Sequence, residues 1–363
     1  MASFGSSLFE RALADAIGRL AGVGLVAMLR DNLLGLRPGE VHPELTDADL
    51  AGWAGREPPA TLAVRHTVGL VDPIVAADLG PERGDDGLPR TLEEYVRAHG
   101  LRYFKLKVAG EVDADVDRLE RIASALDTLI PDRYRVTVDG NEQYKSIHQF
   151  ERLVEAMRKA PRLGRLLDAI LFIEQPLDRA VALDASATEG LRALSQAVPL
   201  VIDESDGELD AFKSALALGY RGVSSKNCKG IVKAFLNRTL VERLNRQRAA
   251  GAQLFMSAED LTNVPVVPVQ QDLTTVRALG IGHVERNGHH YVRGLDHCSS
   301  AERAAATRLH PDLYRGDGRA AWLRITDGQL RVGSLDAPGY GIAFDPDLEH
   351  MIPLPAWRRE ADR

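Results

Sequence analysis

The feature that most constrains this chain is a series of short apolar runs, each of which leads into a charged side chain. Five such runs end at or directly before Lys107, Asp139, Glu174, Asp203 and Lys226. Successive charged residues in this series stand 23 to 35 positions apart. That interval leaves room for one strand, one helix and two loops, which is typical of a parallel sheet with crossover helices.

A parallel sheet of this kind can close into a (β/α)8 barrel, and other segments supply the remaining strands. Residues 61–69 have the β-branched content of a first strand, and residues 253–256 and 282–285 predict strands seven and eight. Further helices are expected at about 146–160, 208–218 and 230–248. We therefore expect an α/β fold built on a TIM-like barrel, for which 363 residues suffice.

The two ends of the chain lack the alternation of strands and helices that the middle shows. Residues 8–29 predict a helix followed by a turn, whereas residues 35–60 are rich in Gly, Pro and acidic residues and predict a loop-rich linker. Beyond about residue 300 we expect one more helix and then a hairpin over 322–332, where two apolar runs flank an Asp-Gly pair.

Composition limits the classes of partner. The net charge is -7, with acidic and basic residues interspersed, so no nucleic-acid surface is expected and a small solute is the favoured partner. Two cysteines, Cys228 and Cys298, cannot build a disulfide framework or a four-cysteine zinc site. No apolar run approaches the roughly 18 residues of a membrane span, and no signal-peptide pattern opens the chain. We therefore expect no membrane contact and a cytoplasmic location.

Three acidic residues, Asp139, Glu174 and Asp203, stand at successive predicted strand ends. In a barrel the carboxyl ends of all strands meet on one face, so these carboxylates should converge. Carboxylates held close together in a partly desolvated site repel one another and require a cation between them. An all-oxygen ligand set suits Mg²⁺, or alternatively Mn²⁺, better than zinc. Any one of these acids alone could instead be an ordinary surface residue in a salt bridge.

Lysines flank the three acids along the chain. Lys105 and Lys107 are two positions apart in a strand, so both should point into the barrel, where each would lower the other's proton affinity. Lys226 stands four strands further around an eight-strand ring and should lie across the cavity from Lys107. Two bases facing one carbon, with a cation to stabilise a developing enolate, suit proton abstraction next to a carboxylate. Ser257 and Glu259, just past strand seven, are further candidate mouth residues without a motif.

The charged strand ends lie in five motifs that occur in a characteristic order: Lys105-Leu106-Lys107, Asp139-Gly140-Asn141, Phe172-Ile173-Glu174-Gln175-Pro176, Ile202-Asp203-Glu204-Ser205 and Ser225-Lys226-Asn227. This set resembles the enolase superfamily, in particular the two-lysine, muconate-lactonizing branch of its mandelate racemase-like group. The resemblance spans about residues 8 to 345 and includes a closing segment over 327–341.

The resemblance implies a role for each motif residue. Asp139, Glu174 and Asp203 would bind Mg²⁺, while Lys107 and Lys226 would be the two acid/base groups. Lys105 would hold the substrate carboxylate and tune Lys107. Asn141 would contact the substrate, and Glu204 would lie next to the metal ligands without binding the metal itself. Glu285, at the end of strand eight, stands where the family has a substrate-contacting acid. Members are commonly homo-oligomers, so a homo-oligomer is expected here.

The chain departs from the family pattern at its start and at strand eight. Members usually begin with a capping domain of strands and helices. Residues 1–60 of this chain would be only a helical remnant of that domain. The barrel would follow at 61–300, and a C-terminal helix, hairpin and tail at 301–363. Either the cap is naturally reduced or separately encoded, or more of the gene product precedes this chain. Strand eight also lacks the paired aspartates with which dipeptide epimerases of the family hold an amino group.

The function expected from these residues is Mg²⁺-dependent removal of the proton α to a carboxylate, through an enediolate. The outcome could be racemisation or epimerisation, dehydration, or cycloisomerisation, and the motifs do not choose among them. The alternative is a non-catalytic or partner-completed barrel subunit, suggested by the reduced amino terminus. A metal-dependent hydrolase or an aldolase would need His ligands or a lone Schiff-base lysine at the strand ends, and neither stands out.

Overall fold

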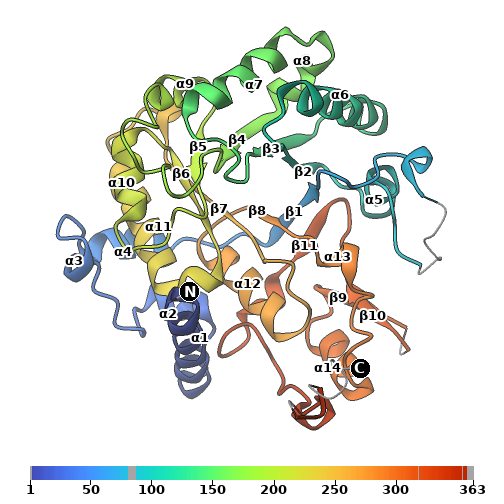
Figure 1. Ribbon diagram of the computed structural model, residues 1–363. Helices are drawn as coiled ribbons and strands as arrows, with labels where there is room; N and C mark the ends of the chain where they lie inside the picture. Colours follow the sequence, from blue (N-terminus) through green and yellow to red (C-terminus); the bar gives the residue numbers. More distant parts are fainter. Residues whose placement is uncertain (1, 81–86, 318, 354, 358–363) are drawn as a thin grey trace.

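Parallel strands follow one another around a curled sheet in the order in which they occur in the chain. The computed structural model describes residues 2–80, 87–317, 319–353 and 355–357 (Figure 1). The parallel strands are β1 (Thr61–Val68), β2 (Tyr103–Lys107), β3 (Arg135–Asp139), β4 (Ile170–Glu174), β5 (Leu200–Ile202), β6 (Gly222–Ser225), β7 (Phe255–Ala258) and β8 (His283–Glu285). Each of β1 to β6 pairs with its successor, and β8 pairs with the other side of β1. A bridge between Glu259 and Glu285 joins the ends of β7 and β8, so the predicted TIM-like barrel is confirmed.

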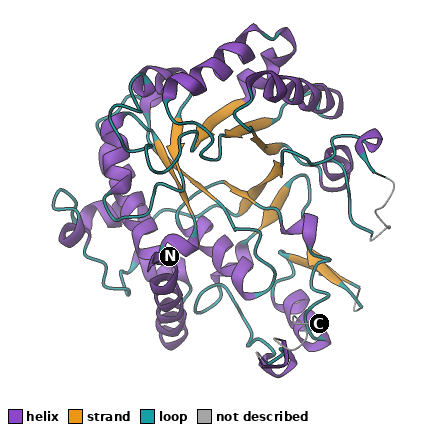
Figure 2. Ribbon diagram, viewed as in Figure 1, coloured by secondary structure: helices purple, strands orange, loops and turns teal. Residues whose placement is uncertain are grey.

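Helices surround these strands (Figure 2). They are α5 (Leu92–His99), α6 (Val112–Leu129), α7 (Ile147–Lys159), α8 (Gly164–Ala169), α9 (Leu191–Ala197), α10 (Ala211–Leu218), α11 (Ile231–Asn245) and α12 (Val267–Ala278), followed by the short α13 (Gly288–Tyr291) and by α14 (Ser300–Leu309). Their apolar faces pack on side chains such as Phe104 and Leu106, which are fully buried. Since neighbouring residues of a strand point to opposite faces, the residues between and after these two point inward.

The segment before the barrel is helical rather than loop-rich. It contains α1 (Ala2–Ala21), α2 (Leu25–Arg30), α3 (Pro38–Val41) and α4 (Asp47–Ala54). The prediction of an irregular linker over 35–60 was therefore wrong in part. The reason is local: Thr46 accepts a hydrogen bond from the backbone of Asp49, whose carboxylate accepts one from the backbone of Thr46. This capping box starts α4 among polar residues that otherwise favour loops.

The C-terminal segment packs back on the barrel, as expected, but with different strand pairing. The predicted hairpin over 322–332 was wrong, because β10 (Ala321–Leu323) pairs with β9 (Tyr314–Gly316), while β11 (Gln329–Arg331) pairs antiparallel with β1. In β11 the side chain of Leu330 is fully buried opposite Leu62, so burial at the barrel edge outweighs a local hairpin. Further on, Tyr340 is fully buried, and Gln270 of α12 donates to the carbonyl of Gly341 at 2.7 Å.

Two further expectations concern boundaries and membranes. The boundaries near residues 60 and 300 stay predictions, and residues 358–363 of the predicted tail lie outside the described part of the chain. Within the described residues, no helix has both the length and the apolar character of a membrane span.

Candidate active site

The charged residues singled out in the sequence gather at the carboxyl ends of the strands. Their centre is the ammonium group of Lys105 on β2, which is 2% exposed. Its Nζ lies 2.9 Å from Asp139 Oδ2 and 3.1 Å from Glu174 Oε2. Two more carboxylates complete its surroundings, those of Glu259 at 3.2 Å and Glu285 at 2.6 Å. One buried cation thus touches four acids from β3, β4 and the ends of β7 and β8.

The protonation of Lys105 follows from these contacts. Burial alone lowers the pKa of a lysine, but the carboxylates of Asp139, Glu174, Glu259 and Glu285 raise the pKa of Lys105 well above its ordinary value. For Lys105 these carboxylates outweigh any lowering of the pKa by the neighbouring Lys107, so the net shift is upward. The sequence shows two neighbouring lysines, whereas only the closed barrel shows how many acids surround the first of them.

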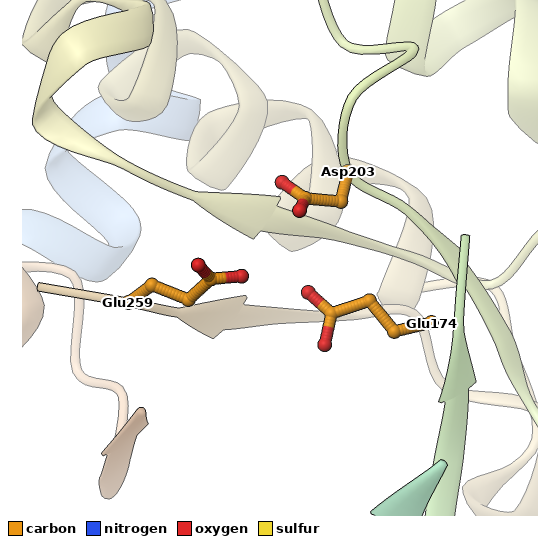
Figure 3. Close-up of side chains that lie close together, drawn as sticks. All are labelled: Glu174, Asp203 and Glu259. Carbon is orange, nitrogen blue, oxygen red and sulfur yellow. The ribbon is translucent and has the colours of Figure 1, made fainter. Parts of the chain in front are cut away.

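Three carboxylates lie close enough together to share a metal ion. Within the described residues these are Glu174, Asp203 and Glu259, all buried, with one ligand oxygen from each lying within 4.8 Å of the others (Figure 3). Glu174 and Asp203 were predicted as metal ligands, whereas Glu259 was noted only as a mouth residue. Asp139, the third predicted ligand, forms ion pairs with Lys105 and Lys107, and its role as a metal ligand stays a prediction. Glu259 had no motif because only the closure of β7 onto the ring brings it to this position.

The chemistry of this cluster fits a divalent cation. Both carboxylate oxygens of Glu174 are buried without a hydrogen-bond partner among the described residues, and its ion pair with Lys105 reaches only Oε2. Burial and the nearby carboxylates of Glu259, Asp139 and Asp203 raise the pKa of Glu174 to about 8, although Lys105 opposes this. Crowded carboxylate oxygens are the ligands that hard cations such as Mg²⁺ prefer, and those of Glu174 have no hydrogen-bond donor among the described residues. Glu174, Asp203 and Glu259 would hold the ion.

Lys107 and Lys226 lie at the edges of the cluster, on β2 and just after β6. Lys107 Nζ donates to Asp139 and, at 2.7 Å, to Asn141 Oδ1. Lys226 Nζ lies 2.6 Å from Asp203 and 2.9 Å from Glu259. Their side chains are 22% and 13% exposed, so both can be reached from the barrel mouth. Burial lowers the pKa of Lys226, but Glu259 and Asp203 raise it above the ordinary value, so this lysine holds a proton.

The remaining predicted residues lie around this centre. Asn141 binds Lys107 and donates its backbone N–H to Asp139 at 2.7 Å. Glu285 binds Lys105 and accepts from Asn287 at 3.0 Å. Burial and the Asp203 carboxylate raise the pKa of Glu204, the residue that follows the candidate ligand, to about 7.

One more lysine belongs to the site and was missed as a functional residue. Lys229 Nζ lies 2.7 Å from Asp203 Oδ1 and from the Asp203 carbonyl, and 2.8 Å from the Ser224 carbonyl. It therefore fixes the orientation of a candidate metal ligand. The available signal was its position three residues after Lys226 in the predicted βα loop.

Below the acid cluster the barrel is filled by a buried arginine and aromatic rings. Arg65 on β1 is fully buried, donates to Ser257 at 2.8 Å and lies 3.2 Å from His283 Nδ1. Its guanidinium stacks over the ring of Phe172, with 5.2 Å to the ring centroid. Burial and this guanidinium lower the pKa of His283 to about 3, so the imidazole is neutral.

Comparison with known proteins agrees with the barrel. The family model described as "Enolase C-terminal domain-like" matches residues 87–348. The chain belongs to the enolase C-terminal domain-like family. The narrower assignment to a two-lysine branch of this family stays a prediction.

Relatives of this family member include epimerases and a cycloisomerase. The chain is 29% identical over 258 residues to the L-Lys-D/L-Arg epimerase of Methylococcus capsulatus, which covers 69% of this chain and 57% of the relative. It therefore spans less than two thirds of that protein.

Two solved structures of low sequence identity share the fold. The 3,6-anhydro-D-galactonate cycloisomerase of Zobellia galactanivorans has a TM-score of 0.57 at 15% identity, over 96% of this chain and 74% of that one. A dipeptide epimerase of M. capsulatus, solved with a Mg ion, has a TM-score of 0.54 at 19% identity, over 92% and 73%.

Proposed function

We propose that this chain moves the proton α to the carboxylate of a small substrate and so racemises or epimerises it. The observation that carries this proposal is the position of Lys107 and Lys226, which reach the same acid cluster from β2 and β6. These strands stand four steps apart in a ring of eight, so a carbon atom between the lysines meets one amine from each side. Such a pair can remove a proton from one face and return a proton to the other.

Each lysine has a distinct starting state in this scheme. Lys226 is held in its charged form by Asp203 and Glu259, so it is ready to donate a proton. Lys107 shares Asp139 with Lys105, and its side chain is more exposed than that of Lys226, so it is the second amine that a substrate can reach. Asn141 holds the Nζ of Lys107 in place.

The proposed cofactor is Mg²⁺ at Glu174, Asp203 and Glu259, with Asp139 beside them. When bound, it would stabilise the negative charge that develops on the substrate carboxylate. An all-oxygen site supports Mg²⁺, and a related dipeptide epimerase was solved with this ion. Mn²⁺ has the same ligand preference and is the second metal to be tried. The proposed location of the enzyme is the cytoplasm.

Solvent-deuterium incorporation at the α carbon tests the proposal. The full chain is incubated with Mg²⁺ in D2O and a panel of carboxylates, in both configurations, and followed by proton NMR. Dipeptides head the panel because a relative is an L-Lys-D/L-Arg epimerase, and hydroxy carboxylates follow. Loss of water or ring formation in the same spectra would instead identify a dehydratase or a cycloisomerase.

Variants of the two lysines decide the mechanism. Lys107→Ala and Lys226→Ala should each abolish interconversion, while one configuration of the substrate still exchanges with the remaining lysine. Lys159→Ala on the exposed side of α7 is the matched control and should leave exchange unchanged. Unaltered exchange in both active-site variants would exclude the proposed roles.

A further inference from the structure

A large cavity lies outside the barrel centre and contains none of the acid cluster. Its volume is about 870 Å³, and its walls come from α5, from the segment after β8 that includes α13, and from the β9–β10 hairpin. These elements lie on the same side of the molecule in Figure 1. The volume lies in the range of small-molecule pockets.

One wall of the cavity carries an arginine and a tryptophan side by side. Arg315 on β9 and Trp322 on β10 are direct partners in the antiparallel pairing, and both line the cavity. Partners opposite each other in such a pair project from the same face of the sheet. Arg315 is exposed and has no ion-pair partner among the described residues.

A histidine of α5 also borders the cavity. His99, at the end of α5, is among the lining residues, and its Nδ1 is buried without a hydrogen-bond partner among the described residues. Burial and the nearby Arg315 guanidinium lower the pKa of His99, so the ring is neutral and adds no charge to the cavity wall. The acidic residue among the described lining is Glu94, whose carboxylate already accepts from the Arg90 backbone at 2.6 Å.

Apolar side chains and Gly294 give the cavity its shape. Val292, Leu323 and Ile325 line it together with the Trp322 ring. A Cβ on Gly294, whose φ is +54°, would meet the Ala321 carbonyl at 2.0 Å and Trp322 Cδ1 at 2.6 Å. A side chain at this position would displace the tryptophan that forms the wall.

We infer that this cavity binds a small organic anion with an apolar body. The guanidinium of Arg315 binds the anionic group, and the apolar body packs on the indole of Trp322. A guanidinium matches the geometry of a carboxylate, and an aromatic ring provides apolar area for the remainder. The site is independent of the proposed function, since it shares no residue with the acid cluster.

The cavity also borders the ends of the strands that carry two of the acids. Arg286 lines it and pairs with Asp260 at 2.8 Å. These two residues directly follow Glu285 and Glu259 in the chain. A ligand in the cavity therefore contacts the segment that positions both carboxylates.

Titration calorimetry of the full chain with 4-phenylbutyrate tests the inference, with 4-phenylbutan-1-ol as the uncharged comparison. We expect the acid to bind with Kd below about 5 mM and the alcohol to bind at least about tenfold more weakly, because a charge-assisted hydrogen bond is lost. Arg315→Gln should weaken the binding of 4-phenylbutyrate by about tenfold or more. Trp322→Ala should also weaken binding of the acid by about tenfold or more, and it should remove any ligand-dependent change in fluorescence that arises from this tryptophan.

Matched controls separate this site from others. Arg319→Gln, also exposed and close to the same hairpin, and Trp357→Ala should bind the acid as the wild type does. Glu174→Gln should also retain binding, which distinguishes the cavity from the barrel site whether or not the proposed activity is found. Absence of binding to the wild-type chain, equal binding of acid and alcohol, or full binding by Arg315→Gln would each overturn the inference. Circular dichroism of each variant verifies folding, and Arg315→Gln, an exposed change, keeps the test valid if Trp322→Ala does not fold.

Discussion

Replacing Glu174 by glutamine tests the physical description of the acid cluster most directly. The carboxyl group is fully buried, and its pKa is raised to about 8 from an ordinary 4.5, mainly by burial. A pKa that is higher in the folded state means that the native protein holds a proton which the unfolded chain releases at neutral pH. In the absence of a cation, stability from this group is therefore greatest below pH 4.5 and is lost as the pH rises towards 8.

The magnitude follows from the distance between the assay pH and the unfolded pKa. At pH 7 that distance is about 2.5 units, and about 1.4 kcal/mol per unit gives a cost of about 3 kcal/mol for the wild type. Glutamine has the same shape as the protonated acid and needs no proton, so Glu174→Gln avoids this cost. With about 2.1 cal/mol/K of unfolding entropy per residue, the variant should melt about 4 °C higher than the wild type in EDTA.

A divalent cation should reverse this order. At about 100 times its Kd, Mg²⁺ stabilises the wild type by about 2.7 kcal/mol, which again corresponds to about 4 °C. Glu174→Gln has lost a charged ligand, so Mg²⁺ should raise its Tm by less than about 1 °C. Thermal melting followed by circular dichroism, with EDTA or with Mg²⁺, measures both effects.

Two outcomes would refute this reasoning. One is a lower Tm of Glu174→Gln than of the wild type in EDTA. The other is a Mg²⁺-dependent rise in Tm that is as large in the variant as in the wild type. Glu155→Gln, on the exposed face of α7, is the control and should behave as the wild type in both buffers.

Three further predictions address the barrel floor, a strand-end turn and the amino-terminal helix. Because the pKa of His283 is about 3 when folded and 6.5 when unfolded, the wild type should lose about 2 kcal/mol of stability relative to His283→Gln between pH 7 and pH 5 in urea unfolding. A Cβ on Gly140 would lie 2.5 Å from Pro176 Cα, so Gly140→Ala should destabilise the fold by about 2 kcal/mol in the same assay. Leu20 is 90% exposed and Phe9 80% exposed on α1, so this face should be buried in the expected homo-oligomer, and Leu20→Glu should shift the mass in light scattering towards the monomer.

Each of these predictions has its own control. Arg308→Gln, at an exposed position on α14, should keep the wild-type pH dependence, and an unchanged slope in His283→Gln would contradict the assignment to the histidine. Gly5→Ala, where a Cβ meets nothing within 4 Å, should not destabilise the fold. A wild-type chain that is monomeric at every concentration would exclude the role of the α1 face.

Much of the barrel could be predicted from the sequence because its signal is local. Apolar runs of strand length alternate with helical patterns, and a charged residue follows each run, so strand order and the face that carries the charges follow from position in the chain. The same reasoning identified Glu174 and Asp203, which the structure brings together. It failed for the linker before the barrel and for the C-terminal hairpin, where a capping box and burial beside β1 outweigh composition.

Only the tertiary structure decided which acids lie close together and which lysines are held in the protonated form. Glu259 joins the candidate metal ligands because β7 closes onto the ring, a contact between segments far apart in the chain. Lys105 is held in its protonated form because four acids from four different strand ends surround it. Electrostatic effects depend on distance and on burial, which no sequence interval specifies. The chain by itself thus determined the set of charged strand ends, and folding determined how they are paired.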